Sequence, residues 1–283
     1  MSAADELDSR KSIKQLYKEW DGCTKCELGQ RRERIETKMV PGRGRHHAIM
    51  LVGDAPSAVE EGMGKSLLDA SGDMLREIMK SLDILDAVYL TNAVCCRSCR
   101  QQENEQGQPV MRERGGYMEP LWEEYPPPKS CLAACRPRLQ QEIYTVDPVI
   151  IVAMGSAAIE TLFGKGISVR SKSGKVEAET VTIPGVGYLP SLTEKCGQWI
   201  RSYSLEKGFV MPTVPATVEY TMIPTYNHNY VHTHVMDAKP GSPFDTLNTA
   251  LRTAAIIYER CMLETYGYVP HATEDSDDEQ TIN

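Results

Sequence analysis

The chain has 283 residues, of which 41% are hydrophobic and 25% are charged, and its formal net charge is −8. These values predict a folded protein of one large or two small domains, and they exclude wholesale disorder, collagen and coiled coil. The longest apolar runs are far shorter than the roughly 20 residues that span a bilayer, and the polar first residues lack a signal-peptide core, so we expect a cytoplasmic protein.

Hydrophobic periodicity predicts strands that alternate with helices along most of the chain. Such alternation predicts an α/β fold with a parallel, doubly wound sheet. The expected elements, in chain order, are a helix at 13–20, a strand at 48–52, a helix at 71–82, a strand at 88–90, a helix at 132–146, a strand at 149–153, a helix that begins at 156–163, a strand at 218–224 and a closing helix at 244–266.

Two polar stretches interrupt this pattern, and one follows it. Residues 100–130 are rich in Gln, Glu, Pro and Gly and are predicted to form an inserted loop, and a second insertion is expected at about 186–212. The end of the chain carries five acids in the six residues 274–279, so residues 269–283 are predicted to be a disordered acidic tail. We therefore expect a lead-in over residues 1–22 and one domain over residues 23–268.

Positive charge is concentrated between residues 31 and 47 and begins with Arg31, Arg32 and Arg34. A solvated face explains such a cluster about as well as a phosphate-binding edge does. The net negative charge does not decide between them, because the local field matters more than net charge when a protein binds a polyanion.

Polar residues follow three of the predicted strands, in the loops Gly53–Glu61, Asn92–Cys99 and Tyr226–His234. Functional residues of parallel sheets gather on loops past the carboxyl ends of the strands. We therefore expect these loops to meet at one site, where the Asn92 amide would suit the edge of a pyrimidine. Each loop alone is also explained as an ordinary turn with surface acids, a capping asparagine or a structural histidine.

Nine cysteines, an odd number, indicate metal ligands or free thiols before disulfides in a reducing compartment. Cys23 and Cys26 form a CxxC pair, which two later groups follow. Four thiolates can hold a structural zinc or an iron–sulfur cluster, and independent buried cysteines are the alternative. The later groups are Cys95, Cys96 and Cys99, and then Cys131 and Cys135.

Seven stretches in this order resemble the uracil-DNA glycosylase superfamily, specifically its iron–sulfur family 4. The resemblance implies a three-layer α/β sandwich with a central, mainly parallel sheet. It also implies DNA as the partner and hydrolysis of the N-glycosidic bond of a flipped pyrimidine. The stretches are CTKC from Cys23, VGDAPSAVEE from Val52, GKSLLDASG from Gly64, YLTNAVCCR from Tyr89, CRPRL from Cys135, IVAMGSAA from Ile151 and PTYNH from Pro224.

The resemblance also implies roles for individual residues. Asp54 or Glu60 would favour the cationic sugar and its attacking water, and His228 (or Asn227) would donate to the departing base. A [4Fe-4S] cluster would have a structural or DNA-positioning role. The implied sets are Asp54, Glu60 and His228 for catalysis, Asn92, Leu67, Ser57 and Asn227 for base binding, and Cys23, Cys26, Cys96 and Cys135 for the cluster, with the phosphate edge at Arg31, Arg32 and Arg34.

The sequence departs from the family in the presumed base pocket. Leu67 occupies the position of a phenylalanine that stacks on the base, and such stacking contributes about 1–3 kcal/mol per base. The family's Tyr-His-Pro is replaced by Tyr226-Asn227-His228. We therefore expect a monofunctional glycosylase for a pyrimidine bulkier than uracil, such as a C5-modified base of phage DNA, with a role in antiviral defence or DNA repair.

Two alternatives stay open at this point. One is uracil excision by a divergent family 4 enzyme, and the other is a non-catalytic iron–sulfur protein that binds DNA. In each case we expect a monomer, no membrane association and no obligate protein partner.

Overall fold

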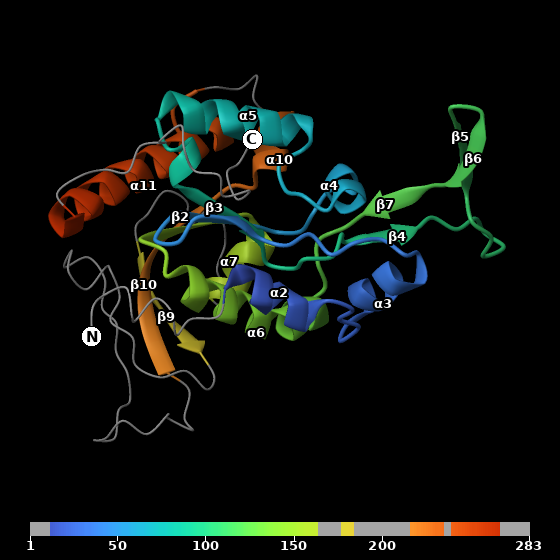
Figure 1. The fold of residues 1–283 in the computed structure, drawn as a ribbon. Coiled ribbons are helices and arrows are strands. Elements are labelled where there is room, and N and C mark those ends of the chain that lie inside the picture. Colours follow the sequence, from blue (N-terminus) through green and yellow to red (C-terminus); the bar gives the residue numbers. More distant parts are fainter. Residues whose placement is uncertain (1–11, 164–176, 184–215, 235–238, 267–283) are drawn as a thin grey trace.

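The computed structural model describes residues 12–163, 177–183, 216–234 and 239–266. A central sheet lies between two layers of helices, and an arm projects from one end of the molecule (Figure 1). The predicted α/β sandwich with a mainly parallel sheet is therefore confirmed. Within the described ranges, no helix is both long and apolar enough to cross a membrane.

The central sheet has six strands in the order β1-β3-β2-β8-β10-β9. The four middle strands are parallel neighbours, whereas β1 and β9 pair antiparallel at the two edges. Every residue of β2, β3 and β8 is buried, as expected for parallel strands that helices cover on both faces. The strands are β1 (Arg43–Gly44), β2 (Ile49–Gly53), β3 (Val88–Asn92), β8 (Ile150–Met154), β9 (Glu177–Ile183) and β10 (Ala216–Thr225).

In Figure 1, α5, α10 and α11 lie on one side of the sheet, and α2, α6 and α7 lie on the other. The five helices that were predicted begin and end within three residues of their expected bounds. Three short helices, α3, α4 and α10, were not expected. Helices α4 and α10 have only six residues each, and Leu28 is the only large apolar residue of α3, so none of the three shows a clear apolar period. The helices are α2 (Ile13–Trp20), α3 (Glu27–Arg34), α4 (Ala58–Met63), α5 (Ala70–Ser81), α6 (Lys129–Val146), α7 (Ser156–Phe163), α10 (His228–Thr233) and α11 (Pro243–Tyr266), with a 3-10 turn at Leu85–Ala87.

The prediction of a loop over residues 100–130 is wrong. Strand β4 (Cys99–Gln101) pairs with β7 (Trp122–Glu124), and β5 (Met111–Arg114) pairs with β6 (Tyr117–Pro120). These pairs form the projecting arm (Figure 1). All four residues of β5 are exposed, so the strand has no buried face to impose an alternating apolar pattern on the sequence.

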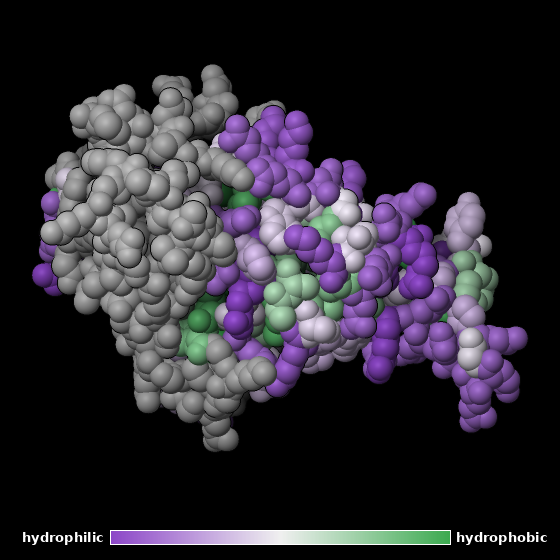
Figure 2. All heavy atoms as spheres, turned by 90° about the horizontal axis from the view of Figure 1, so that it is seen from below, coloured by the Kyte–Doolittle hydropathy of each residue, from purple (hydrophilic) through white to green (hydrophobic). Residues whose placement is uncertain are grey.

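The described surface in Figure 2 is mainly hydrophilic, with small apolar patches that include one on the arm. The exposed large apolar side chains of the arm are those of Met111, Tyr117 and Met118. The second predicted insertion, at 186–212, and the predicted tail, at 269–283, lie outside the described residues.

Candidate functional site

The carboxyl ends of three parallel strands, of which β2 and β3 are neighbours and β10 lies beyond β8, bring the predicted loops together. Asp54 directly follows β2, Asn92 ends β3 beside Gly53, and Asn227 follows β10. The Asn227 amide Nδ2 donates a hydrogen bond of 3.0 Å to Asp54 Oδ2, which joins residues 173 positions apart. Three of the predicted site residues therefore share one edge of the sheet.

The Asp54 carboxylate is held by the first turn of α7. Its Oδ1 accepts the backbone N–H groups of Ala157 at 2.8 Å and Ala158 at 2.9 Å, which have no partner inside the helix. Burial raises the pKa of Asp54 to about 6, although these two N–H groups and the Asn227 amide lower it. A Cβ at Gly155, whose φ is +106°, would lie 2.3 Å from Asp54 Oδ2, so this position requires glycine.

The Asn92 side chain is packed tightly against β2. It is 7% exposed, and a Cβ on Gly53 would lie 2.4 Å from its Oδ1. The missing side chain of Gly53 therefore makes room for this amide. Arg138 Nη2 donates to the backbone carbonyl of Asn92 at 2.5 Å.

The Leu67 backbone lies in the left-handed region, with φ 57°, and its side chain is 3% exposed. The Leu67 N–H donates to Glu60 Oε1, and the Leu67 carbonyl accepts from Arg76. One residue earlier, the Ser66 carbonyl accepts from Arg43 Nη2 at 2.8 Å. Charged side chains therefore hold this loop through its backbone groups.

Glu60 is a structural partner of two backbone segments. Its Oε2 accepts the Ser57 N–H at 2.8 Å, in a capping box that begins α4, while Oε1 accepts from Leu67. Burial raises the pKa of Glu60, and hydrogen bonds from Ser57 and Leu67 oppose the rise. The structure therefore places Ser57, Glu60 and Leu67 in one network.

His228 is the first residue of α10 and is 8% exposed. Among the described residues, its Nδ1 has no hydrogen-bond partner. Burial lowers the pKa of His228 to about 4; nearby Asp69 opposes this shift and His232 adds to it. The imidazole is therefore neutral at pH 7 and can offer an uncharged N–H donor.

Asp69 was not singled out from the sequence, although it connects this network to His228. It caps α5 by accepting from Ser71 Oγ at 2.6 Å and from the Gly72 N–H at 2.9 Å. Burial alone would raise the pKa of Asp69, but these bonds and one from Ser57 lower it overall. The sequence signal was an aspartate directly before a helical period, which is typical of an N-cap.

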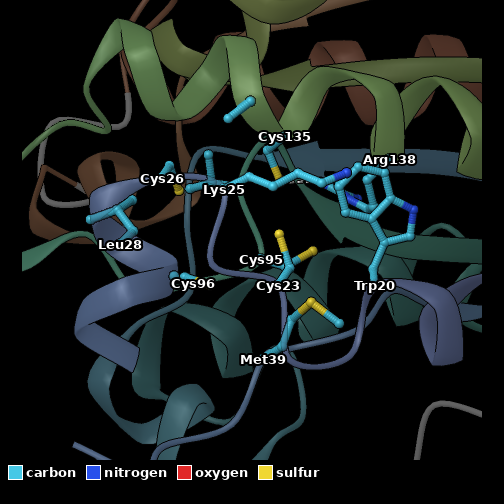
Figure 3. Close-up of a pocket in the computed structure, with 13 residues that line it drawn as sticks. Trp20, Cys23, Lys25, Cys26, Leu28, Met39, Cys95, Cys96, Cys135 and Arg138 are labelled. Carbon is cyan, nitrogen blue, oxygen red and sulfur yellow. Dashed lines mark hydrogen bonds between the residues drawn. The ribbon is translucent and has the colours of Figure 1, made fainter. Parts of the chain in front are cut away.

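The four cysteines predicted to hold a cluster line one pocket, shown in Figure 3. Its volume is about 400 Å³, open solvent included, and Cys95 lines it as well. All five cysteines are free thiols. Among the described residues, no three His, Cys, Asp or Glu side chains are grouped in a way that could hold a metal ion. The predicted set is Cys23, Cys26, Cys96 and Cys135.

Different elements carry these cysteines. Cys26 precedes α3 as its N-cap residue, Cys96 lies beyond the end of β3, and Cys135 belongs to α6. Burial raises the pKa of Cys96 to about 12. A hydrogen bond from Cys95 and the charge of nearby Arg138 lower the pKa of Cys135, against the effect of burial. Segments far apart in the chain therefore bring these four thiols to one pocket.

The structure separates the three arginines that were predicted to form a phosphate edge. Arg31 is 6% exposed and donates to Glu61 and to the Arg97 carbonyl. Arg32 is 7% exposed and donates to the Cys23 carbonyl at 3.2 Å. Only Arg34 is exposed, because α3 turns its first two arginines toward the protein interior.

Comparison with known proteins gives one matching family model. Residues 41–252 match the model described as "Uracil DNA glycosylase superfamily". Type-4 uracil-DNA glycosylases are among the similar curated proteins. That of Sulfurisphaera tokodaii is 28% identical over 65% of this chain and 70% of its own length. The enzyme of Saccharolobus solfataricus is 27% identical over 59% of this chain and 66% of its own length. The enzyme of Archaeoglobus fulgidus is 27% identical over 54% of this chain and 64% of its own length. The chain thus spans roughly two thirds of these relatives.

The burial of His228 predicts its titration. We expect its imidazole resonances to titrate with a pKa near 4 and to stay constant between pH 5.5 and 8, because desolvation disfavours the charged form. The chain has six histidines, so His228→Gln assigns the signal in a proton–nitrogen NMR titration. A His228 pKa above 6 would contradict the buried, neutral state.

Proposed function

Because this chain belongs to the uracil DNA glycosylase superfamily, we propose that it hydrolyses the N-glycosidic bond of a pyrimidine flipped out of DNA. The observation that carries this proposal is the meeting of Asp54, Asn92 and Asn227 at one sheet edge, with Asp54 bound to both α7 and Asn227. Flipping is required because the glycosidic bond cannot be reached inside a duplex.

In the proposed reaction, the bond between the sugar C1′ and the base nitrogen breaks while a water oxygen bonds to C1′. Positive charge develops on the sugar, negative charge develops on the departing base, and a water proton ends on the base. A preorganised carboxylate stabilises the cationic sugar and orients the water. We assign this role to Asp54, because the α7 N–H groups and Asn227 already hold its oxygens in place.

The base would lie between Asn92 and His228. The Asn92 amide offers a donor and an acceptor to a pyrimidine edge, and the neutral His228 offers an N–H to the developing negative charge. We give Glu60 a positioning role instead, because its two oxygens cap α4 and hold the Leu67 loop, whereas Asp54 directly follows β2 at the sheet edge that carries Asn92. Asn227 orients Asp54.

We propose a pyrimidine with a bulky C5 substituent as the base, and defence against phage with modified DNA as the role. The supporting observation is Leu67, which stands where the resemblance places a phenylalanine that stacks on the base. The leucine side chain is smaller, and hydrogen bonds to its backbone hold the loop in place. Uracil is the second candidate, because the similar curated proteins are named type-4 uracil-DNA glycosylases.

We further propose that Cys23, Cys26, Cys96 and Cys135 hold a [4Fe-4S] cluster. Their free thiols line one pocket, which is the donor set that such clusters use. The cluster would brace the fold beside the DNA, and Arg34 would contact phosphate.

A panel of DNAs tests the proposed substrate. We expect release of a C5-modified pyrimidine to be faster than release of uracil or a normal base, as measured by single-turnover assay. Leu67→Phe should restore stacking but fill the pocket, so it should slow release of the bulky base and spare or speed release of uracil. Efficient uracil release that Leu67→Phe only improves would select uracil repair, whereas DNA binding without any release would indicate a non-catalytic protein.

The raised pKa of Asp54 predicts the pH dependence. The reaction needs ionised Asp54, so the single-turnover rate should fall as the pH drops through about 6. Asp54→Asn should lower the rate at pH 7.5 at least tenfold, about 1.4 kcal/mol of barrier, and should abolish this pH step. The matched control is Glu77→Gln, an exposed acid on α5.

The stability of the folded state should show the opposite dependence. Since folding raises the pKa of Asp54 from 3.8 to about 6, its contribution to stability is greatest at low pH and decreases as the pH rises through this range. Asp54→Asn should therefore flatten the pH dependence of the unfolding temperature. A rate that stays constant from pH 5 to 8 in the wild type would contradict the assigned role.

Iron analysis tests the cluster. Purified protein should be brown and contain about four irons per chain. Cys96→Ser or Cys135→Ser should lose the colour and lower the unfolding temperature, because the cluster joins separate segments. Cys99→Ser is the control, since Cys99 does not line the pocket. Zinc without iron in anaerobically prepared protein would overturn the assignment.

A further inference from the structure

Arg138 and Glu142 form an ion pair inside the protein, one turn apart on α6, and both are 0% exposed. Burial of two charges costs more than their attraction returns unless the geometry and the remaining hydrogen bonds are in place. They are in place at Glu142, whose carboxylate also accepts from the hydroxyl groups of Tyr17 at 2.5 Å, Tyr89 at 2.7 Å and Thr91 at 2.9 Å. On Arg138, both Nη atoms have partners, whereas Nε has none among the described residues.

The second Nη atom of the Arg138 guanidinium does not contribute to this ion pair but binds the backbone at the end of β3. Its Nη2 donates to two consecutive carbonyls, those of Asn92 at 2.5 Å and Ala93 at 3.0 Å. The same nitrogen lies 3.8 Å from Cys135 Sγ, and Arg138 lines the cysteine pocket (Figure 3). One rigid group therefore touches both the base-reading segment and the wall of the cysteine pocket.

We propose that Arg138 is a positioning residue, which fixes the backbone of Asn92 so that its amide meets the flipped base. This proposal rests on the proposed base-reading function of Asn92. A planar guanidinium can hold Glu142 with one nitrogen and two carbonyls with the other, whereas a lysine ammonium is a single point with no fork. The ion pair with Glu142 orients the Arg138 guanidinium.

A double-mutant cycle tests the proposal in the full-length protein. Arg138→Lys keeps the charge beside Glu142 but removes the fork, so the single-turnover rate should fall at least tenfold while DNA affinity stays within twofold. In an Asn92→Ala background, the same change should cost less than twofold, because Arg138 acts through Asn92. Equal losses in both backgrounds would overturn the proposal.

Tyr89→Phe is the matched control. It removes a hydrogen bond of 2.7 Å to the same carboxylate and touches neither Asn92 nor Cys135, so it should lower stability but leave the rate unchanged. If Tyr89→Phe slows the reaction as much as Arg138→Lys does, the effect is general loosening and the proposal fails. If Arg138→Lys does not fold, the pair is replaced as a unit by Arg138→Met with Glu142→Gln, which strands no charge.

Hydrogen exchange gives a readout that needs no catalysis. Amide exchange over residues 92–96 should be about tenfold faster in Arg138→Lys, or in the double replacement, than in Tyr89→Phe, because only the first two lose the carbonyl clamp. Unchanged exchange would overturn the positioning role even in an active enzyme. If the wild type releases no base from any DNA while this exchange rises as expected, the proposed function fails and the clamp on Asn92 stands.

Discussion

The Glu142 carboxylate is the interaction on which the arrangement of the other parts depends. It is fully buried and accepts hydrogen bonds from Tyr17 of α2, from Tyr89 and Thr91 of β3, and from Arg138 of its own helix. A buried charge that loses a partner is strongly destabilising, so these three elements must dock together or not at all. Because α6 carries Cys135 and β3 ends at Asn92, this docking also fixes the position of the cysteine pocket relative to the end of β3.

In the candidate site, hydrogen bonds oppose the effect of burial on the pKa of Asp54, and a nearby charge opposes it at His228. Burial raises the pKa of Asp54, and two helix N–H groups with the Asn227 amide limit the rise to about 6. Burial lowers the pKa of His228 to about 4, against the charge of Asp69. At neutral pH the site therefore holds an ionised carboxylate and a neutral imidazole. That combination suits a reaction whose sugar becomes positive while its base becomes negative.

Much of the charge around the site supports the backbone. Leu67 is held with positive φ, a conformation that costs about 1–3 kcal/mol for such a residue. Glu60 accepts its N–H, Arg76 donates to its carbonyl, and Arg43 donates to the preceding carbonyl. A loop strained in this way persists only because its surroundings hold it in place, so groups that need not touch the base would set the shape of the proposed base pocket.

The sequence by itself determined the order of the four parallel strands and of helices α2, α5, α6, α7 and α11, because buried parallel strands and amphipathic helices have local apolar patterns that can be recognised. Strand ends then placed Asp54 and Asn92 on one edge, and motif order selected the four cysteines that share a pocket. Only the tertiary structure decided the rest. It buried Arg31 and exposed Arg34 on one short helix, and it folded residues 99–124 into an arm. It also revealed that Asp69 and Arg138 hold neighbouring segments together. The role of such a polar side chain depends on partners that are distant in the chain, and a local sequence pattern does not identify these partners.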